Sequence, residues 1–389
     1  MTSSNALESL IAFIREIYGG DPIPLHRPVF VGNERKYVVE CIDSNFVSSV
    51  GARVAEFEQM VARYTGSRHA VATVNGTAAL QVALRLAGVR SGDEVLTQAV
   101  TFVATCNALA HLSAEPVFVD VDRETMGMSP DALHAWLSQH AECRPSGVFN
   151  KTSGRRIAAC VPMHTFGHPC RVPMIQELCA AWNLPLIEDA AESLGSRIDG
   201  RHTGTFGVMG TLSFNGNKVI TTGGGGMILT DDERVAAHAK HLTTTAKRPH
   251  PYEFFHDEVG YNYRLPNLNA ALGCAQMETL PAMLCAKAEI ARRYREFCGR
   301  LGIQYVSAPA GAQSWLHSIV LDDVKQRDWF LRESNNRGVM TRPIWRLMSA
   351  LPAFERCQHD GLKHSIWLEE RVVNIPSGVP DSMIRSIAP

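Results

Sequence analysis

The sequence predicts an α/β protein with two domains: a large domain around a mostly parallel seven-stranded sheet, and a smaller C-terminal α+β domain. Between about residues 69 and 240, short apolar runs alternate with segments of helical periodicity, which is the pattern of βα units stacked into a parallel sheet. A long helical segment follows and leads into a second set of short strands. With 389 residues, 45% hydrophobic and 20% charged, the chain has the length and composition of two globular domains.

The first expected element is an amphipathic helix over Met1–Tyr18, whose apolar residues recur at helical spacing. We assign residues 1–24 to a helical extension and residues 25–265 to the large domain. Its strands are expected at His69–Thr73, Glu94–Thr97, Pro116–Val119, Ile157–Met163, Pro185–Glu188, Gly210–Phe214 and Met227–Thr230. Helices are expected between them at Thr77–Ala87, Phe102–His111 and Val172–Trp182.

The remaining segments are a surface excursion and the small domain. Residues 141–156 are polar and predict an excursion from the large domain. The stretch Asn267–Arg300 predicts one long helix that bridges into the small domain, which we assign to residues 266–389 together with this helix. Strands are expected there at Ser318–Leu321 and Val339–Thr341.

The composition argues against several classes of function. The chain has 38 Lys and Arg against 39 Asp and Glu, so it has no overall basic field to attract nucleic acid or anionic lipid. The ten cysteines include no C-x-x-C pair, which argues against a zinc ribbon or a disulfide scaffold, and we expect no metal site. No signal peptide opens the chain and no run of about 18 apolar residues occurs, so we expect a cytoplasmic protein without a membrane span.

A candidate phosphate site follows the first strand. The segment Thr73–Ala79 reads T-V-N-G-T-A-A, in which Gly76 and Thr77 open an alanine-rich helix. Free backbone N–H groups, a hydroxyl and the positive end of the helix dipole suit a phosphate at such a position. The alternative is an ordinary strand-to-helix turn with an N-cap.

Three carboxylates end a later strand. Leu186–Glu192 is an apolar strand that closes with Glu188, Asp189 and, three residues on, Glu192. Because a buried acid is costly without a cation or a hydrogen-bond donor, we expect a positively charged partner there. The alternative is that Glu188 and Asp189 cap the next helix or are solvated.

A lysine follows another strand and precedes four glycines. Lys218 lies between the strand at Gly210–Phe214 and Gly223–Gly226, and glycines leave room for a bulky group against the backbone. An enclosed lysine that loses hydration is suited to Schiff-base chemistry. The lysine precedes the glycines and no G-x-G-x-x-G occurs, so neither a P-loop nor a Rossmann dinucleotide site is supported.

Together these segments supply a phosphate cradle, an acid for a protonated ring nitrogen and an amine for an imine. Pyridoxal phosphate is the cofactor that needs all three. In order and spacing these motifs, with Thr101–Thr105 and with Gly260–Arg264 before the long helix, resemble the DegT/StrS family of nucleotide-sugar aminotransferases, which are type I pyridoxal phosphate enzymes. The resemblance extends from about residue 24 to about residue 380.

The resemblance implies a role for each matching residue. Lys218 corresponds to the lysine that forms a Schiff base with the cofactor and then moves the proton, and Asp189 to the acid that pairs with the pyridine nitrogen. The other matches are Gly76, Thr77, Ala78 and Ser213 in the phosphate cradle, Phe102 stacked on the ring, and Asn262 at the cofactor phosphate of a neighbouring subunit. A homodimer with shared active sites is therefore implied.

Two positions bear on the type of reaction. Glu192 stands where many relatives have Gln or His against the phenolic oxygen of the cofactor, and we expect it to be protonated or to share a proton. Related proteins that dehydrate sugars have a histidine at the position of Lys218, so the lysine favours amino transfer.

The substrate is inferred from stretches near both ends of the chain. Pro24–Glu34, Phe46–Gly51 and Met340–Trp345 resemble the branch that acts on UDP-linked 4-keto-6-deoxy-N-acetylhexosamines, in the legionaminic acid and bacillosamine routes. Arg342 would pair with a diphosphate and Trp345 would lie on a uracil or sugar face, the alternatives being a surface arginine and a core tryptophan. His164 follows a strand end and is a further candidate substrate contact, against a structural role.

We therefore expect an aminotransferase that moves an amino group from an amino acid, with L-glutamate as first choice, to C4 of a nucleotide-linked 4-keto-6-deoxy sugar. The first choice of sugar is UDP-4-keto-6-deoxy-N-acetylglucosamine. The alternatives are the same chemistry on a GDP- or dTDP-linked keto sugar, another pyridoxal phosphate reaction such as an aldolase or a dehydratase, or a regulator that keeps the fold without the chemistry.

Overall fold

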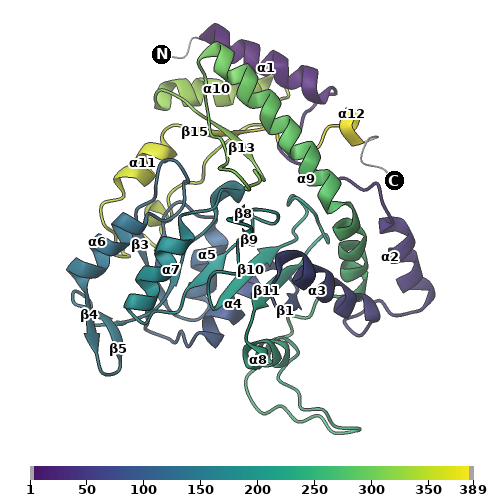
Figure 1. Ribbon diagram of the computed structural model, residues 1–389, viewed down its shortest axis with the longest axis vertical. Coiled ribbons are helices and arrows are strands. Elements are labelled where there is room, and N and C mark those ends of the chain that lie inside the picture. The colour runs from purple at the N-terminus through teal and green to yellow at the C-terminus, as the bar shows by residue number, and fades with distance from the viewer. Residues whose placement is uncertain (1–3, 385–389) are drawn as a thin grey trace.

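The computed structural model describes residues 4–384, which form a large layered domain and a smaller domain joined by a long helix (Figure 1). The sheet of the large domain has seven strands in the order β1-β11-β10-β7-β6-β2-β3. They are β1 (His69–Thr73), β2 (Glu94–Gln98), β3 (Glu115–Val119), β6 (Arg156–Val161), β7 (Ile187–Asp189), β10 (Met209–Ser213) and β11 (Gly226–Thr230). Parallel bridges from Cys160 to Leu186 and from Met163 to Asp189 join β6 to β7.

The prediction of a mostly parallel seven-stranded sheet is confirmed. Strand β11 is antiparallel to both of its neighbours, and the other six strands run in one direction. Successive strand residues pack on opposite faces, since Val95 belongs to the core on one face and Leu96 to the core on the other. Burial on both faces explains why these strands read as continuous apolar runs in the sequence.

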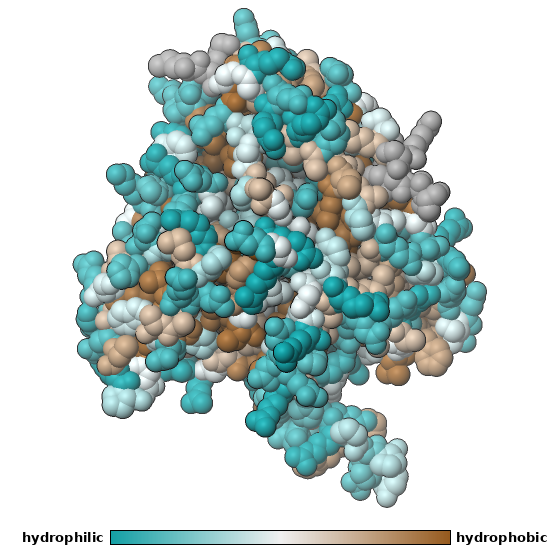
Figure 2. Space-filling model, in the orientation of Figure 1, coloured by the Kyte–Doolittle hydropathy of each residue, from teal (hydrophilic) through white to brown (hydrophobic). Residues whose placement is uncertain are grey.

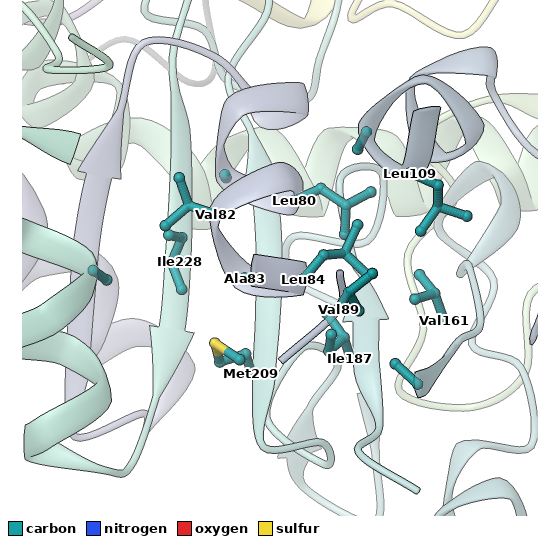
Figure 3. Packing of buried hydrophobic residues seen from close by; sticks show 14 of the residues in the cluster. Leu80, Val82, Ala83, Leu84, Val89, Leu109, Val161, Ile187, Met209 and Ile228 are labelled. Carbon is teal, nitrogen blue, oxygen red and sulfur yellow. The ribbon is translucent and has the colours of Figure 1, made fainter. Parts of the chain in front are cut away.

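Helices cover both faces of the large sheet. One face is covered by α4 (Gly76–Leu86), α5 (Val103–Ala110) and α8 (Glu233–Thr243). Figure 3 shows Leu80 and Leu84 of α4 and Leu109 of α5 among the strand residues Val161 and Ile187. The opposite face is covered by α3 (Ala52–Thr65), α6 (Pro130–His140) and α7 (Val172–Ala181).

The long helix α9 (Asn267–Leu301) links the two domains, so the prediction of a helix over residues 267–300 is confirmed. Helix α2 (Glu34–Asp43) lies beside its first half, and α1 (Ser4–Tyr18) packs on its second half through a shared apolar core. Gly302 ends the helix in the left-handed conformation, with φ of 67°. The amphipathic helix predicted from Met1 is present from Ser4, and residues 1–3 lie outside the described part.

The small domain is built on a four-stranded antiparallel sheet. Its order is β12 (Gln304–Tyr305), β13 (His317–Val320), β15 (Val372–Ile375) and β14 (Arg342–Pro343). Its helices are α10 (Val324–Asn336), α11 (Lys363–Glu369) and α12 (Asp381–Ile384), with 3₁₀ turns at Met348–Ala350 and, in the large domain, at Thr165–Gly167. The strand predicted at Val339–Thr341 is wrong, because Val339 forms only an isolated bridge with Ile23 and pairing with β15 begins at Arg342.

Two hairpins and an arm leave the large domain. The polar segment 141–156 contains a hairpin of β4 (Ala141–Arg144) and β5 (Gly147–Asn150), which extends the sheet beside β6. A second, shorter hairpin pairs β8 (Arg197–Ile198) with β9 (Arg201–His202). Residues 244–260 form an arm that projects below α8, and Figure 2 shows it as a largely hydrophilic projection from the lower edge.

The arm is fastened to α8 at its base. Asp257 accepts hydrogen bonds from His241 at 2.6 Å and from Arg248 at 2.7 Å, and His238 lies 2.7 Å from Glu258. Further out, Tyr252, Phe254 and Phe255 are exposed. Across residues 4–384, no helix is both long enough and apolar enough to cross a bilayer.

Candidate active site

A cavity of about 610 Å³ lies where the large sheet meets the small domain. The ends of β7 and β10 and the start of α4 border it from the large domain, as expected for a ligand site beyond the carboxyl ends of parallel strands. The predicted residues around it are Gly76, Thr77, Phe102, Asp189, Glu192, Ser213, Lys218, Arg342 and Trp345. The structure therefore brings together in one cavity most of the residues that the sequence singled out from separate segments.

Lys218 lies in the loop after β10, and its side chain is 12% exposed. Its Nζ is 3.2 Å from Glu192 Oε1 and 3.9 Å from the centre of the Trp315 ring. The indole N–H of Trp315 donates at 2.6 Å to the carbonyl of Asn217, the residue before the lysine. The amine is therefore held between a carboxylate and an aromatic face at the edge of the cavity.

Asp189 is the last residue of β7 and is buried. Its Oδ2 accepts a hydrogen bond from Thr105 Oγ1 at 2.7 Å, and its Oδ1 accepts one from the N–H of Ala191 at 3.2 Å. Both donors fix the carboxylate in the wall of the cavity. An acid held in this way can meet a protonated ring nitrogen and stabilise its charge.

Glu188 points to the other side of the strand, because successive residues of a strand face opposite ways. Its carboxylate accepts hydrogen bonds from the N–H groups of Gly204 at 2.7 Å, Gly207 at 2.8 Å and also Phe206. The partners of this acid are therefore three backbone donors and the ring of His164, whose pKa, against the opposing effect of burial, is raised to about 10 by Cys170 and Glu188.

His164 does not border the cavity. Its side chain is fully buried, with Nε2 3.0 Å from Glu188 Oε2 and Nδ1 accepting a hydrogen bond from the N–H of Cys170 at 3.3 Å. The prediction that His164 contacts the substrate therefore fails in this structure, and the structural role holds. The reason is that the ring of His164 is held by Glu188, the same carboxylate that binds the N–H groups of Gly204, Phe206 and Gly207.

Glu192 is the buried acid beside the lysine, with 4% of the residue exposed. Its Oε2 accepts a hydrogen bond from the N–H of Phe166 at 2.9 Å, and its Oε1 faces Lys218. Burial raises the pKa of Glu192 to about 6, against the opposing effects of Lys218 and the Phe166 N–H. A carboxyl with such a pKa exchanges a proton close to neutral pH.

The sequence left open whether the start of α4 is a phosphate site or an ordinary turn with an N-cap, and the structure has features of both. Asn75 caps α4, since its Oδ1 accepts a hydrogen bond from the Ala78 N–H at 2.8 Å. Gly76, Thr77 and Ser213 border the cavity, whereas the Ala78 N–H is taken by the cap. The start of α4 therefore supplies Thr77 and the positive end of the helix dipole, and Ser213 at the end of β10 supplies a second hydroxyl.

The four glycines after Lys218 do not face the cavity, which corrects the interpretation that they make room for a bulky group. A Cβ on Gly226 would lie 2.3 Å from the carbonyl oxygen of Asn75, and one on Gly225 would lie 2.3 Å from Thr222 Oγ1. Gly223 has φ of +78°. Gly226 therefore lets β11 approach the start of α4 closely, and Gly225 lies against Thr222.

The mouth of the cavity is aromatic and cationic. Phe102 is half exposed, and the centre of its ring is 6.3 Å from that of Trp345. Arg342 and Arg346 are exposed on the small-domain side. The sequence analysis missed Arg346, Trp315 and Asn374, because no strand-end motif marks them and only the packing of the small domain brings them here.

Asn262 lies outside the cavity of its own chain. It is exposed between α8 and α9, where its Oδ1 accepts a hydrogen bond from Arg264 Nε at 2.9 Å. Its backbone pairs with Thr244 at the base of the arm. Contact with the cofactor of a neighbouring subunit stays a prediction.

The residues around the cavity fit pyridoxal phosphate. Gly76, Thr77 and Ser213 form a cradle for an anion, and Asp189 and Lys218 line the same cavity. The open face of Phe102 offers an aromatic surface beside them. This donor set matches each functional group of the cofactor: phosphate, ring nitrogen, ring face and aldehyde.

Comparison with known proteins agrees with this arrangement. The model of the DegT/DnrJ/EryC1/StrS aminotransferase family matches residues 30–381. The chain is 38% identical over 342 residues to the pyridoxal phosphate-dependent aminotransferase EpsN of Bacillus subtilis (strain 168), covering 86% of this chain and 84% of EpsN. It is 34% identical over 358 residues to GDP-perosamine synthase of Escherichia coli O157:H7, covering 91% and 93%.

Solved structures show the same fold. The aminotransferase TlmJ from Streptoalloteichus hindustanus superimposes with a TM-score of 0.83 at 28% identity, covering 95% of this chain and 97% of TlmJ. DesI in the presence of its TDP-sugar product gives 0.81 at 28% identity, covering 96% and 92%. The type I fold predicted from the sequence is thereby confirmed. The chain belongs to the DegT/DnrJ/EryC1/StrS aminotransferase family and is a pyridoxal phosphate-dependent aminotransferase.

Proposed function

We propose that the protein transfers an amino group from L-glutamate to C4 of a nucleotide-linked 4-keto-6-deoxy sugar. The observation that carries this proposal is the composition of the single cavity around Lys218 and Asp189. Its inner part has the groups for amine chemistry, and its mouth has two arginines and an indole. Guanidinium groups pair with a diphosphate and flat rings lie on a base or sugar, so the mouth suits a nucleotide sugar.

Lys218 and Asp189 are the proposed catalytic residues. When bound, pyridoxal phosphate supplies an aldehyde carbon for the amine and a ring that accepts electrons. Asp189, held by Thr105, keeps the ring nitrogen protonated. The Lys218 Nζ binds the cofactor, and once free it takes and returns the proton on the substrate carbon.

Glu192 is the proposed proton partner of Lys218. The two side chains are 3.2 Å apart, and the pKa of about 6 for Glu192 allows this carboxyl to hold or release a proton at neutral pH. Gly76, Thr77, Ala78 and Ser213 are the proposed phosphate-binding residues, with Ala78 contributing through its position in the first turn of α4.

For the sugar nucleotide, we favour UDP-4-keto-6-deoxy-N-acetylglucosamine, with Arg342 on the diphosphate and Trp345 on the uracil or sugar. The support is the likeness of the segments around Phe30 and Arg342 to that branch. A GDP-linked keto sugar is the competing candidate, because relatives 33–35% identical to this chain are named GDP-perosamine synthases.

A panel of UDP-, GDP- and dTDP-linked 4-keto-6-deoxy sugars, assayed with glutamate, decides between these candidates. Glutamate should remove the visible absorption of the bound cofactor, and the correct keto sugar should restore it. Turnover with a GDP or dTDP sugar and none with any UDP sugar would overturn the UDP assignment and leave the chemistry intact. Loss of both half-reactions in Lys218→Ala is expected, and an unchanged rate there would overturn the proposal as a whole.

We propose in addition that the active protein is a homodimer in which Asn262 reaches the cofactor phosphate of the neighbouring chain. The support is that Asn262 is exposed and lies away from its own cavity, next to an arm with exposed aromatic side chains. Exposed aromatic groups of this kind are common at protein interfaces.

A further inference from the structure

The bridging helix α9 buries a lysine at the junction of the two domains. Lys287 is 2% exposed, and among the described residues the hydrogen-bond partners of its amine are two backbone carbonyls and an imidazole. Its Nζ donates hydrogen bonds to the carbonyls of Trp315 at 2.9 Å and Ser377 at 2.7 Å, and it lies 3.3 Å from His26 Nε2. All three donors of the ammonium are therefore used on neutral acceptors.

The three acceptors belong to three separate segments that border the active-site cavity. Leu25, next to His26, lines the cavity, as do Trp315 itself and Asn374, three residues before Ser377. The segments also bond to one another, since the Ser377 N–H donates to the Leu25 carbonyl at 2.7 Å. One amine therefore ties three parts of the cavity wall to α9.

Trp315 is fixed at three further points. Its N–H donates to the Phe166 carbonyl at 2.7 Å, its indole N–H donates to Asn217, and its ring face lies 3.9 Å from the Lys218 Nζ. The Phe166 N–H in turn donates to the carboxylate of Glu192 at 2.9 Å. Both groups that flank the Lys218 amine, the indole and the carboxylate, are thus connected to the backbone of Trp315.

We infer that Lys287 is a positioning residue for the amine chemistry: by anchoring the Trp315 carbonyl, it fixes the indole and, through Phe166, the carboxylate that flank Lys218. This inference rests on the role proposed for Lys218. Displacements well below 1 Å matter for a reacting amine, so an anchor on this backbone affects its rate. Space filling alone does not explain a lysine here, because an apolar side chain of similar length would avoid the cost of burying a charge.

The charge state of Lys287 agrees with this cost. Burial lowers the pKa of Lys287 to about 7. The groups that face it are His26 and His317, and burial and Lys287 hold the pKa of both imidazoles well below the ordinary value. The neighbouring rings are therefore neutral, and His26 Nε2 is free to accept the hydrogen bond.

The test compares Lys287→Met with Tyr294→Phe. Tyr294 is a matched control: it is buried on the same helix and its hydroxyl donates at 2.9 Å to the carbonyl of Pro376, next to Ser377, but it does not touch Trp315. The Pro376 carbonyl keeps a second donor, Tyr18 Oη. Tyr294→Phe therefore removes a buried hydrogen bond of α9 to this segment without leaving the Pro376 carbonyl unpaired. If loss of any buried hydrogen bond of α9 at this junction is enough to loosen it, both variants should show the effect.

The first readout is the exposure of the Trp315 ring in cofactor-free protein. The chain has six tryptophans, so each variant is also made with Trp315→Phe, and the difference in fluorescence isolates Trp315. Quenching of Trp315 by acrylamide should increase at least about twofold in Lys287→Met and stay unchanged in Tyr294→Phe, because only the first loses the anchor. Equal quenching in wild type and Lys287→Met would overturn the inference.

The second readout is the rate at which cofactor-free protein captures pyridoxal phosphate on Lys218, measured by borohydride trapping and mass spectrometry. Lys287→Met should slow capture by about tenfold, and Tyr294→Phe by less than about twofold. In a Trp315→Leu background, Lys287→Met should have little further effect, because the group it positions is gone. Equal slowing in Lys287→Met and Tyr294→Phe would reduce Lys287 to a structural residue.

Two further outcomes complete the test. If Lys287→Met does not fold, Trp315→Leu is decisive, since unchanged capture there overturns the connection and slowed capture supports it. Capture requires no sugar, so the test is separate from the proposed function. Normal capture with no amino transfer to any sugar nucleotide would contradict the proposed function and leave the inference about Lys287 standing.

Discussion

Glu192 shows how one residue combines burial, a neighbouring charge and chemistry. Its carboxyl is removed from water, which favours the neutral acid, while the Lys218 amine and the Phe166 N–H favour the carboxylate. Burial is the larger effect, and the pKa rises from 4.5 to about 6. The expectation that Glu192 holds or shares a proton agrees with this direction.

This shift makes stability depend on pH. Between pH 4.5 and about 6 the folded protein binds more protons at Glu192 than the unfolded chain does, so this residue makes stability fall as pH rises. Glu192→Gln removes the titration. In cofactor-free protein, the variant should gain about 1.5 kcal/mol relative to wild type between pH 4.5 and pH 6.5, measured by urea unfolding. A difference that does not vary with pH would contradict the assignment.

Glu188 is adjacent to Asp189, the proposed catalytic acid, and has a different task. Its buried carboxylate holds the loop at Gly204–Gly207 through three backbone N–H groups. In Glu188→Gln, one carboxylate oxygen becomes an amide NH2 group, which cannot accept hydrogen bonds from these N–H groups. The free energy of unfolding should fall by about 3 kcal/mol. Glu115→Gln, which removes an exposed partner of Arg155, is the control and should change it by less than about 1 kcal/mol. Equal losses would show that Glu188 is not an anchor.

At the scale of elements, the cradle depends on close contact between β11 and the start of α4. Gly226, the first residue of β11, has no room for a Cβ, because the backbone of Asn75 and Gly76 lies against it. Gly224, two residues earlier, has only the Val74 carbonyl at 3.7 Å from the position of a Cβ and no positive φ. The two glycines therefore make a matched pair.

Gly226→Ala should push α4 away from β11. We expect a loss of about 1–3 kcal/mol in stability and at least about tenfold weaker binding of pyridoxal phosphate, measured by equilibrium dialysis with cofactor-free protein. Gly224→Ala should bind the cofactor within about threefold of wild type. If the glycines instead made room for the cofactor itself, Gly224→Ala would be as harmful as Gly226→Ala.

The seven strands of the large sheet and α9 were predicted, whereas the two-residue strands β12 and β14 were not. The seven strands of the large sheet and α9 are long or continuous apolar patterns, because they are buried on both faces or along a full stripe. Strands β12 and β14 have two residues each, and β14 has both residues exposed, so no periodicity marks them. Their position follows from pairing with β13 and β15, which is a long-range property.

At the scale of the whole molecule, the proposed dimer has a direct test. If Asn262 acts on the neighbouring chain, a mixture of Lys218→Ala and Asn262→Ala chains forms heterodimers in which one site has both native residues. Refolding equal amounts together should recover up to about a quarter of the wild-type rate. A mixture of Lys218→Ala and Asp189→Asn is the control and should recover nothing, because both residues belong to the same cavity. No recovery in the first mixture would contradict shared sites.

The fold class and the cofactor followed from the sequence alone, which also singled out the residues proposed to hold the cofactor. Lys218, Asp189 and the start of α4 each follow a strand, and the carboxyl ends of parallel strands meet at one edge of a sheet, so local motifs are enough to place them together. His164 has the same kind of position, but only the packing of the Gly204–Gly207 loop decides that it faces Glu188 and not the cavity.

How the cavity is closed depends on contacts between the two domains. Trp315, Arg346 and Lys287 come from the small domain and the bridging helix, and nothing in their local sequence points to Lys218. Their placement depends on how α9 orients one domain relative to the other. That orientation results from many weak contacts between residues far apart in the chain. Periodicity and motifs report local burial, and they contain no information about which distant backbone carbonyl a buried amine will meet.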